Sequence, residues 1–160
     1  FNNLITEKPT TSVFAEYSML EVEFFKNGDA DKFKNKNISS YIIGFNSTIP
    51  MSETLDLIGT IGLSEGFSYN FITGNLAINL SENFALTAGS GLYFINDDRW
   101  VTLGLDGNEA SNLEFGMNFG LNLMLNNSLG LTIKYNVIEE KQEDVSSLSL
   151  NGLSFGLILK

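Results

Sequence analysis

The 160-residue chain contains no cysteine and no histidine. The absence of cysteine excludes disulfides, thiolate nucleophiles and metal sites built on cysteine. The absence of histidine removes the commonest general base and the commonest transition-metal ligand. We therefore expect no catalytic residue, no metal site and no cofactor, and we interpret the chain as a non-enzymatic protein.

Basic residues are also scarce, with nine Lys and Arg against nineteen Asp and Glu and a formal net charge of -10. Binding to nucleic-acid phosphates depends on clustered Lys and Arg, so we expect no nucleic-acid partner. No run approaches the roughly 18 consecutive apolar residues of a membrane helix. The search for apolar runs does not detect the strands of a membrane barrel, because such strands appear in a sequence only as alternating hydrophobicity over about ten residues.

The pattern that is present is an alternation with a period of two. In NLEFGMNFGLNLML, residues 112–125, one parity is apolar and the other consists of Asn, Gly and one Glu. Gly, Asn, Ser, Thr, Phe and Ile crowd these stretches, a composition that disfavours helix and suits strands. The apolar parity comprises Leu113, Phe115, Met117, Phe119, Leu121, Leu123 and Leu125.

Seven more stretches alternate in the same way, which predicts eight strands. They are residues 12–25, 38–49, 54–64, 70–80, 83–95, 129–138 and the last residues of the chain, from about 152. The phase of the first breaks near Met19 and Leu20, and Leu148 and Leu150 are out of phase with the last. These breaks predict two β-bulges.

The lengths of the connections alternate as well. Short turns are expected at residues 50–53, 81–82 and 126–128, and longer segments at residues 26–37, 65–69, 96–111 and 139–147. This order is typical of an antiparallel up-and-down barrel. We expect a polar N-terminal arm at residues 1–11 and one barrel domain at residues 12–160.

The polar parity distinguishes two kinds of barrel. A soluble barrel normally carries abundant Lys and Glu on its outer face, whereas this parity carries mostly Gly, Asn, Ser and Thr. Such residues suit the narrow interior of an eight-stranded barrel, with the apolar parity facing lipid. The alternative is a soluble lipocalin-like barrel, in which the apolar parity would enclose an apolar ligand.

The predicted architecture and the final strand, LNGLSFGLILK, resemble the small outer-membrane barrels of the OmpA-like and OmpX-like families. Gly152, Phe155 and Leu157 match the C-terminal assembly signal of these families, although Leu159 and Lys160 stand where the signal has a terminal Phe. The resemblance implies an eight-stranded transmembrane β-barrel in the bacterial outer membrane. It also implies that the N-terminus and the short turns are periplasmic and the longer loops extracellular.

Parity also predicts which charged side chains enter the lumen. Lys134 faces Gly120 if the faces match across the turn at residues 126–128, and an unpaired buried ammonium would be costly. We expect Lys134 to join a structural ion pair or network, with Glu16 and Glu114 as the first candidates; a gating element of a narrow pore is the alternative. The lumen charges so predicted are Glu16, Asp56, Glu114 and Lys134, joined by Glu21 and Glu23 if the first bulge exists.

Among the longer segments, NDDRWVTLGLDGN at residues 96–108 is the most distinctive. Its Asp106-Gly107 pair favours a tight turn, and Trp100 is interpreted as an interfacial anchor or hairpin residue. Arg99 and Trp100 are alternatively contact residues for a partner.

These observations predict a structural or interaction role exerted through the loops, such as adhesion, envelope integrity or service as an accessory subunit. The expected partners are outer-membrane lipid and another outer-membrane protein or complex. A narrow channel for small solutes or ions is the alternative function.

Overall fold

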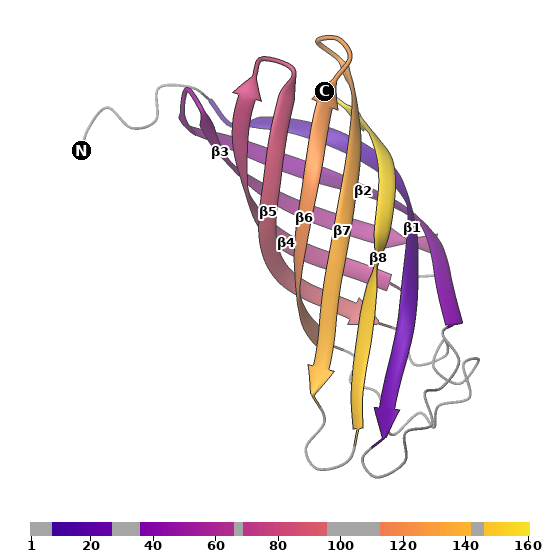
Figure 1. Cartoon of the computed structure of the whole chain (residues 1–160). Helices are drawn as coiled ribbons and strands as arrows, with labels where there is room; N and C mark the ends of the chain where they lie inside the picture. The colour runs from indigo at the N-terminus through magenta and orange to yellow at the C-terminus, as the bar shows by residue number, and fades with distance from the viewer. Residues whose placement is uncertain (1–7, 27–35, 66–68, 96–112, 142–145) are drawn as a thin grey trace.

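The computed structural model describes residues 8–26, 36–65, 69–95, 113–141 and 146–160. Within them it contains eight β-strands (Figure 1). The strands are β1 (Thr10–Lys26), β2 (Lys36–Ser52), β3 (Leu55–Ser64), β4 (Tyr69–Ser81), β5 (Phe84–Ile95), β6 (Leu113–Met124), β7 (Leu129–Lys141) and β8 (Ser146–Leu159). No helix in this part of the chain is long and apolar enough to span a membrane.

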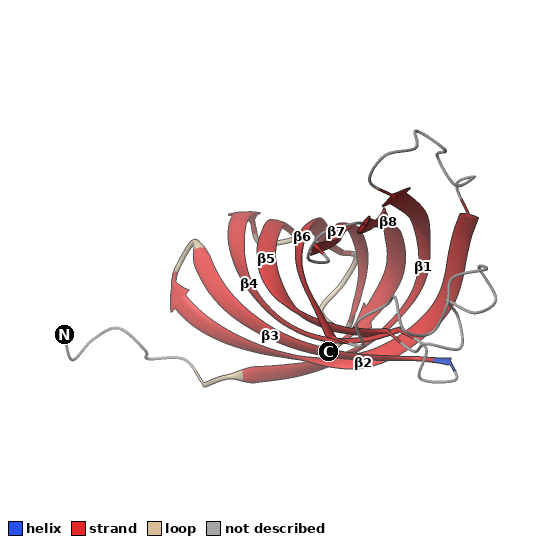
Figure 2. Ribbon diagram, turned by 90° about the horizontal axis from the view of Figure 1, so that it is seen from below, coloured by secondary structure: helices blue, strands red, loops and turns tan. Residues whose placement is uncertain are grey.

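The strands form a closed antiparallel barrel in which each strand pairs with the next and β8 pairs with β1. Seen along the barrel, they curve around a common interior (Figure 2). Closure gives every strand a neighbour on both sides, which removes unpaired sheet edges. The all-β, eight-stranded, up-and-down barrel predicted from the sequence is confirmed.

Three short connections lie at one end of the barrel, which we call the turn end and which is uppermost in Figure 1. They join β2 to β3, β4 to β5 and β6 to β7. The register shifts between Pro50 and Ser52 and again between Asn79 and Ser81, so β2 continues through the proline that was expected to begin a turn. The first residue of β1 and the last residue of β8 also belong to this end, because Val13 pairs with Leu159. The opposite end is the loop end.

The apolar parity points outward on all eight strands, and the sequence-based orientation of the two faces is confirmed. Ile43 and Tyr41 are each 66% exposed, and Phe115 is 61% exposed. A soluble monomer rarely exposes contiguous apolar surface on this scale. The soluble lipocalin-like alternative required these side chains to lie inside the barrel, and the structure shows the opposite.

The bulges predicted near Met19–Leu20 and Leu148–Leu150 are wrong. The register of β1 with β2 and with β8 is unbroken through both positions, and β7 and β8 also pair without a shift. Leu20 and Leu150 keep the inward parity and are 2% and 1% exposed. The change of pattern marks a change in the lumen, which becomes apolar toward the loop end.

Because the first bulge does not exist, Glu21 does not enter the lumen. Its side chain lies on the outward parity of β1 and is exposed. Glu23 belongs to β1, but its side chain lies outside the described part of the structure. The prediction that Glu21 contributes a charge to the lumen is therefore wrong.

Substitution of Phe119 by Arg tests the outward face. Phe119 lies near the middle of β6 and is 51% exposed, and Arg at mid-depth in lipid costs about 2 to 4 kcal/mol. We expect the free energy of unfolding, measured by denaturant titration of the barrel folded into lipid vesicles, to fall by that amount. Asn127→Arg, in the exposed β6–β7 turn, is the control and should change it by less than about 0.5 kcal/mol. Equal effects of the two substitutions would contradict a lipid-facing wall.

Candidate functional site

The barrel interior is built by the parity that alternates with the apolar wall. Near mid-height, Lys134 on β7 meets Glu16 on β1, with 2.7 Å between Lys134 Nζ and Glu16 Oε2. The Glu16 side chain is 2% exposed and that of Lys134 is 17% exposed. A charge-assisted hydrogen bond at this distance compensates part of the cost of removing both groups from water.

Two glycines leave room for this pair. Gly120 on β6 pairs with Lys134, as predicted, and a Cβ there would lie 3.2 Å from Lys134 Cγ. Gly156 on β8 pairs with Glu16, where a Cβ would lie 2.7 Å from Glu16 Cβ. A Cβ would also lie 2.8 Å from the backbone oxygen of Ile133 at Gly120 and 2.7 Å from that of Ala15 at Gly156, so the close approach of the neighbouring strands excludes a side chain at both positions.

Aromatic rings extend the environment of the lysine. Lys134 Nζ lies 4.7 Å from the ring centroid of Phe14 and 5.6 Å from that of Phe71. Both distances are within the range of favourable cation–π attraction. The ammonium thus contacts a carboxylate and two ring faces, a combination that holds its long side chain in one position.

The other two predicted lumen charges lie elsewhere in the barrel. Asp56 lies near the β2–β3 turn, where Asn79 Nδ2 donates a 2.9 Å hydrogen bond to Asp56 Oδ2. Glu114 is buried near the loop end, at the start of β6, and pairs with Tyr93 across the sheet. The structure thus brings Glu16 to Lys134 and places Asp56 and Glu114 toward opposite ends of the lumen.

Toward the loop end, large apolar side chains fill the lumen. We call this cluster the lumen plug; its members are Leu20, Ile42, Tyr69, Phe71, Tyr93, Ile138 and Leu150, and none is more than 5% exposed. The rings of Tyr69, Phe71 and Tyr93 lie with centroids 5.7 to 5.8 Å apart. Such spacing is typical of packed aromatic side chains.

The strands leave space for the plug at glycines. A Cβ on Gly62 would lie 2.4 Å from the Phe71 ring, and a Cβ on Gly116 would lie 2.7 Å from the Tyr93 ring. The ring of each aromatic residue therefore occupies the space that a side chain on a neighbouring strand would need. Sequence reasoning missed the plug, although large apolar residues on the Gly, Asn and Thr parity were its visible signal.

Polar side chains link strands around the lumen. Asn136 Nδ2 donates to Ser154 Oγ, which donates to Ser18 Oγ, both at 3.0 Å, so the chain of bonds crosses β7, β8 and β1. On the other side, Thr60 Oγ1 donates a 2.9 Å bond to Asn46 Oδ1. These bonds satisfy buried hydroxyl and amide groups, which would otherwise be costly.

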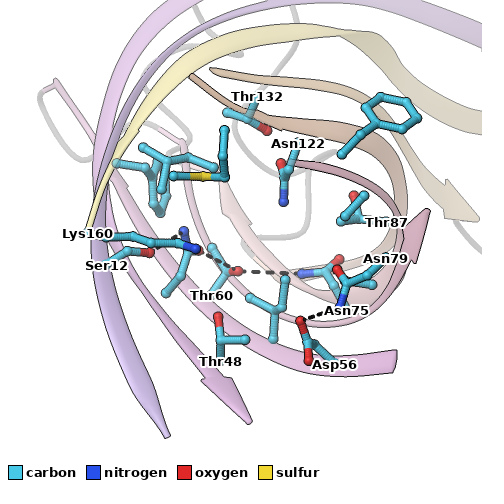
Figure 3. A pocket seen from close by; sticks show the side chains of 18 of the residues that line it. Ser12, Thr48, Asp56, Thr60, Asn75, Asn79, Thr87, Asn122, Thr132 and Lys160 are labelled. Carbon is cyan, nitrogen blue, oxygen red and sulfur yellow. Dashed lines mark hydrogen bonds between the residues drawn. The ribbon is translucent and has the colours of Figure 1, made fainter. Parts of the chain in front are cut away.

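Between the Glu16–Lys134 pair and the turn end, the interior contains a cavity of about 130 Å³ (Figure 3). Its lining includes the amides and hydroxyls of Asn75, Asn79, Thr87 and Asn122. Thus large buried side chains fill the lumen on one side of the ion pair, and the lumen on the other side contains a cavity lined by both polar and apolar side chains.

The remaining predicted contact residues are not placed by the structure. Arg99 and Trp100 lie in residues 96–112, outside the described residues. Among the residues that are described, no group of three or more Asp or Glu side chains is arranged to hold a metal ion.

Comparisons with known proteins give structural likenesses only. No protein-family model matches the chain, and no curated protein matches it significantly. The crystal structure of Neisserial surface protein A (NspA) matches with a TM-score of 0.47 and 11% identity over 96% of this chain and 99% of that one. The chain resembles small outer-membrane barrels in fold.

Two further structures illustrate the range of the likeness. Ail, the attachment invasion locus protein of Yersinia pestis, crystallised with the heparin analogue sucrose octasulfate, matches with a TM-score of 0.43 and 13% identity, covering 91% of this chain and 98% of that one. The outer-membrane protein OprG of Pseudomonas aeruginosa matches with a TM-score of 0.33 and 11% identity, covering 97% and 99%. Likenesses this distant describe the arrangement of strands and carry no argument about activity.

A double-mutant cycle on Glu16 and Lys134 tests the ion pair. Lys134→Met alone leaves a buried carboxylate without its cation, and we expect it to lower the free energy of unfolding by about 3 kcal/mol. Glu16→Gln together with Lys134→Met removes both charges and should cost less than Lys134→Met alone. Denaturant titrations of the four proteins in lipid vesicles measure the coupling. Additive effects of the two substitutions would show that the pair contributes no interaction.

Proposed function

We propose that the protein is an integral outer-membrane barrel that conducts no solute and acts by holding its loop end at the membrane surface, in a structural or interaction role. The observation that carries the proposal is the combination of an apolar outer wall with a filled lumen. The outer wall on all eight strands suits lipid. The lumen plug fills the loop-end half of the barrel with large buried side chains.

The plug argues against the channel alternative. Tyr93, Leu20, Ile42, Ile138 and Leu150 are among the largest fully buried side chains of the described residues. A hydrated ion would have to displace them or lose its water, and burial of an unpaired ion is costly. In this proposal the cavity near the turn end is therefore closed toward the loop end.

The same proposal assigns an orientation. The short turns, the start of β1 and the end of β8 all lie at the turn end. This arrangement is typical of outer-membrane barrels with periplasmic turns. We therefore place the turn end in the periplasm and the loop end outside the cell. The contacts made there are assigned to the longer connections, including Arg99 and Trp100. A larger outer-membrane complex is a further candidate partner for this end.

The proposal includes no catalysis. The full sequence lacks His and Cys, which are the commonest general base and the strongest side-chain nucleophile at neutral pH. The buried Glu16 carboxylate is already engaged by Lys134. This supports a role in contact and anchoring.

Planar-bilayer recording tests the absence of conduction. We expect the wild-type barrel to give no steady unitary current, because the plug seals the loop-end half. Combined Phe71→Ala and Tyr93→Ala substitutions remove two plug rings and should produce a measurable ion leak; the matched pair Phe115→Ala and Phe119→Ala on the outer wall should not. A steady, solute-selective current through the wild-type protein would overturn the proposal.

Cysteine labelling of intact cells tests the orientation, and the chain is suited to it because it has no cysteine of its own. Asn37 on the loop-end side of β2 and Asn127 in the β6–β7 turn are both exposed. We expect a membrane-impermeant maleimide to label Asn37→Cys at least about tenfold faster than Asn127→Cys, because the outer membrane shields the turn. After lysis both should react. Preferential labelling of Asn127→Cys in intact cells would reverse the proposed orientation.

A further inference from the structure

The apolar band on the outer wall is not equally deep on every strand. On β6 it covers residues 113–123, where every outward side chain is apolar and exposed. On β1 it covers only residues 13–19, and on β8 only residues 153–159. We call the paired strands β8 and β1 the seam; in Figure 1 the seam lies to the right of β6, with β7 between them.

The length of each band gives its depth in the membrane. With a rise of about 3.3 Å per residue and a strand tilt of about 40°, residues 113–123 cover about 25 Å of depth, the usual height of the apolar band. Residues 129–137 on β7 cover about 20 Å, and the bands of β8 and β1 cover about 15 Å each. The seam is therefore shorter than the usual band by about 10 Å.

Polar residues border the seam at the loop end, and the wall itself stops at the turn end. Glu21 on β1 pairs directly with Asn151 on β8, and both have the outward parity. At the turn end, Val13 pairs with Leu159, the last residue of β8, and the next outward residue of β1 is the exposed Thr11. A tilt of the whole barrel would move the seam up or down in the membrane, but it would not lengthen the apolar band.

The bilayer must adapt to this short band. Immersion of the Glu21 carboxylate and the Asn151 amide in hydrocarbon is costly. Both side chains are too short to reach across a deficit of about 10 Å to the headgroups. A bilayer adapts to a short apolar stretch by becoming thinner beside it, at a cost that grows with the mismatch. Lipids with short acyl chains reduce that mismatch.

We propose that the seam thins the membrane beside it and selects lipids with short acyl chains as its neighbours. The wall at β6 matches a bilayer of ordinary thickness and makes no such selection. This lateral contact with lipid goes beyond the surface role proposed above, and either of the two can fail without the other.

Quenching of tryptophan by brominated lipid tests the selection. In a Trp100→Phe background, Phe155→Trp on β8 and Phe119→Trp on β6 place matched reporters near the middle of the two bands. The full chain is folded into vesicles that contain equal amounts of dilauroyl phosphatidylcholine, a short-chain lipid, and dibrominated dioleoyl phosphatidylcholine, a long-chain quencher. We expect the ratio of short to long lipid to be at least about twofold higher beside Phe155→Trp than beside Phe119→Trp.

Two double variants separate the length of the band from other causes. Glu21→Leu with Asn151→Leu extends the apolar band of the seam and should reduce the difference between the reporters. Glu53→Leu with Asn127→Leu makes the same exchanges at exposed turn positions and should leave the difference unchanged. Heat-modifiable electrophoretic mobility checks that each variant is folded.

Vesicles of the quencher alone provide the reference, and both reporters should be quenched equally there because both face lipid. Weaker quenching of Phe155→Trp in these vesicles would mean that a second copy of the chain covers the seam, and it would overturn the proposal. Equal lipid ratios beside the two reporters in the mixture would also overturn it. So would a difference that Glu21→Leu with Asn151→Leu leaves intact.

Discussion

Backbone hydrogen bonding is the constraint from which the rest of this structure follows. Lipid offers no partner to an exposed N–H or C=O group, so a sheet that crosses a membrane must pair every strand on both sides. The bond ladder between β8 and β1 supplies that closure. With eight strands, closure leaves an interior only wide enough for side chains. The size and polarity of each inward side chain must therefore fit the side chains across the lumen as well as its neighbours on adjacent strands.

That narrow interior divides into three levels with different chemistry. Aromatic and aliphatic side chains fill the loop-end half, and the rings of Phe14 and Phe71 then border the ammonium of Lys134. The Glu16–Lys134 pair closes this level. On the turn-end side of the pair, polar and apolar side chains together surround a cavity. Lys134 lies at the boundary between the two levels, because it contacts the rings of Phe14 and Phe71 and also lines the cavity.

Glycine makes this arrangement possible on the inward face of the strands. Inward glycines such as Gly62 and Gly120 lie where a Cβ would meet a neighbouring side chain. Outward Gly74 has nothing within 4 Å of such a Cβ, so the fold places no steric demand there. The distribution of glycine therefore records where the lumen is crowded.

The alternation, connection lengths and sparsely charged polar parity of the sequence determined the strand number, the barrel topology and which face meets lipid. Each of these properties can be read from single strands and turns, because the alternation of apolar and polar residues is present within each strand. Sequence also matched Lys134 with Gly120, because a short turn sets the register of one hairpin. It misread Leu20 and Leu150 as bulges, and it missed the plug. The inward position of Leu20 and Leu150 and the packing of the plug depend on contacts across the lumen between strands that are distant in sequence. The contact between Glu16 on β1 and Lys134 on β7 is of the same kind. Only closure of the barrel decides that, because strand tilt and register around the whole circle set the height of each residue.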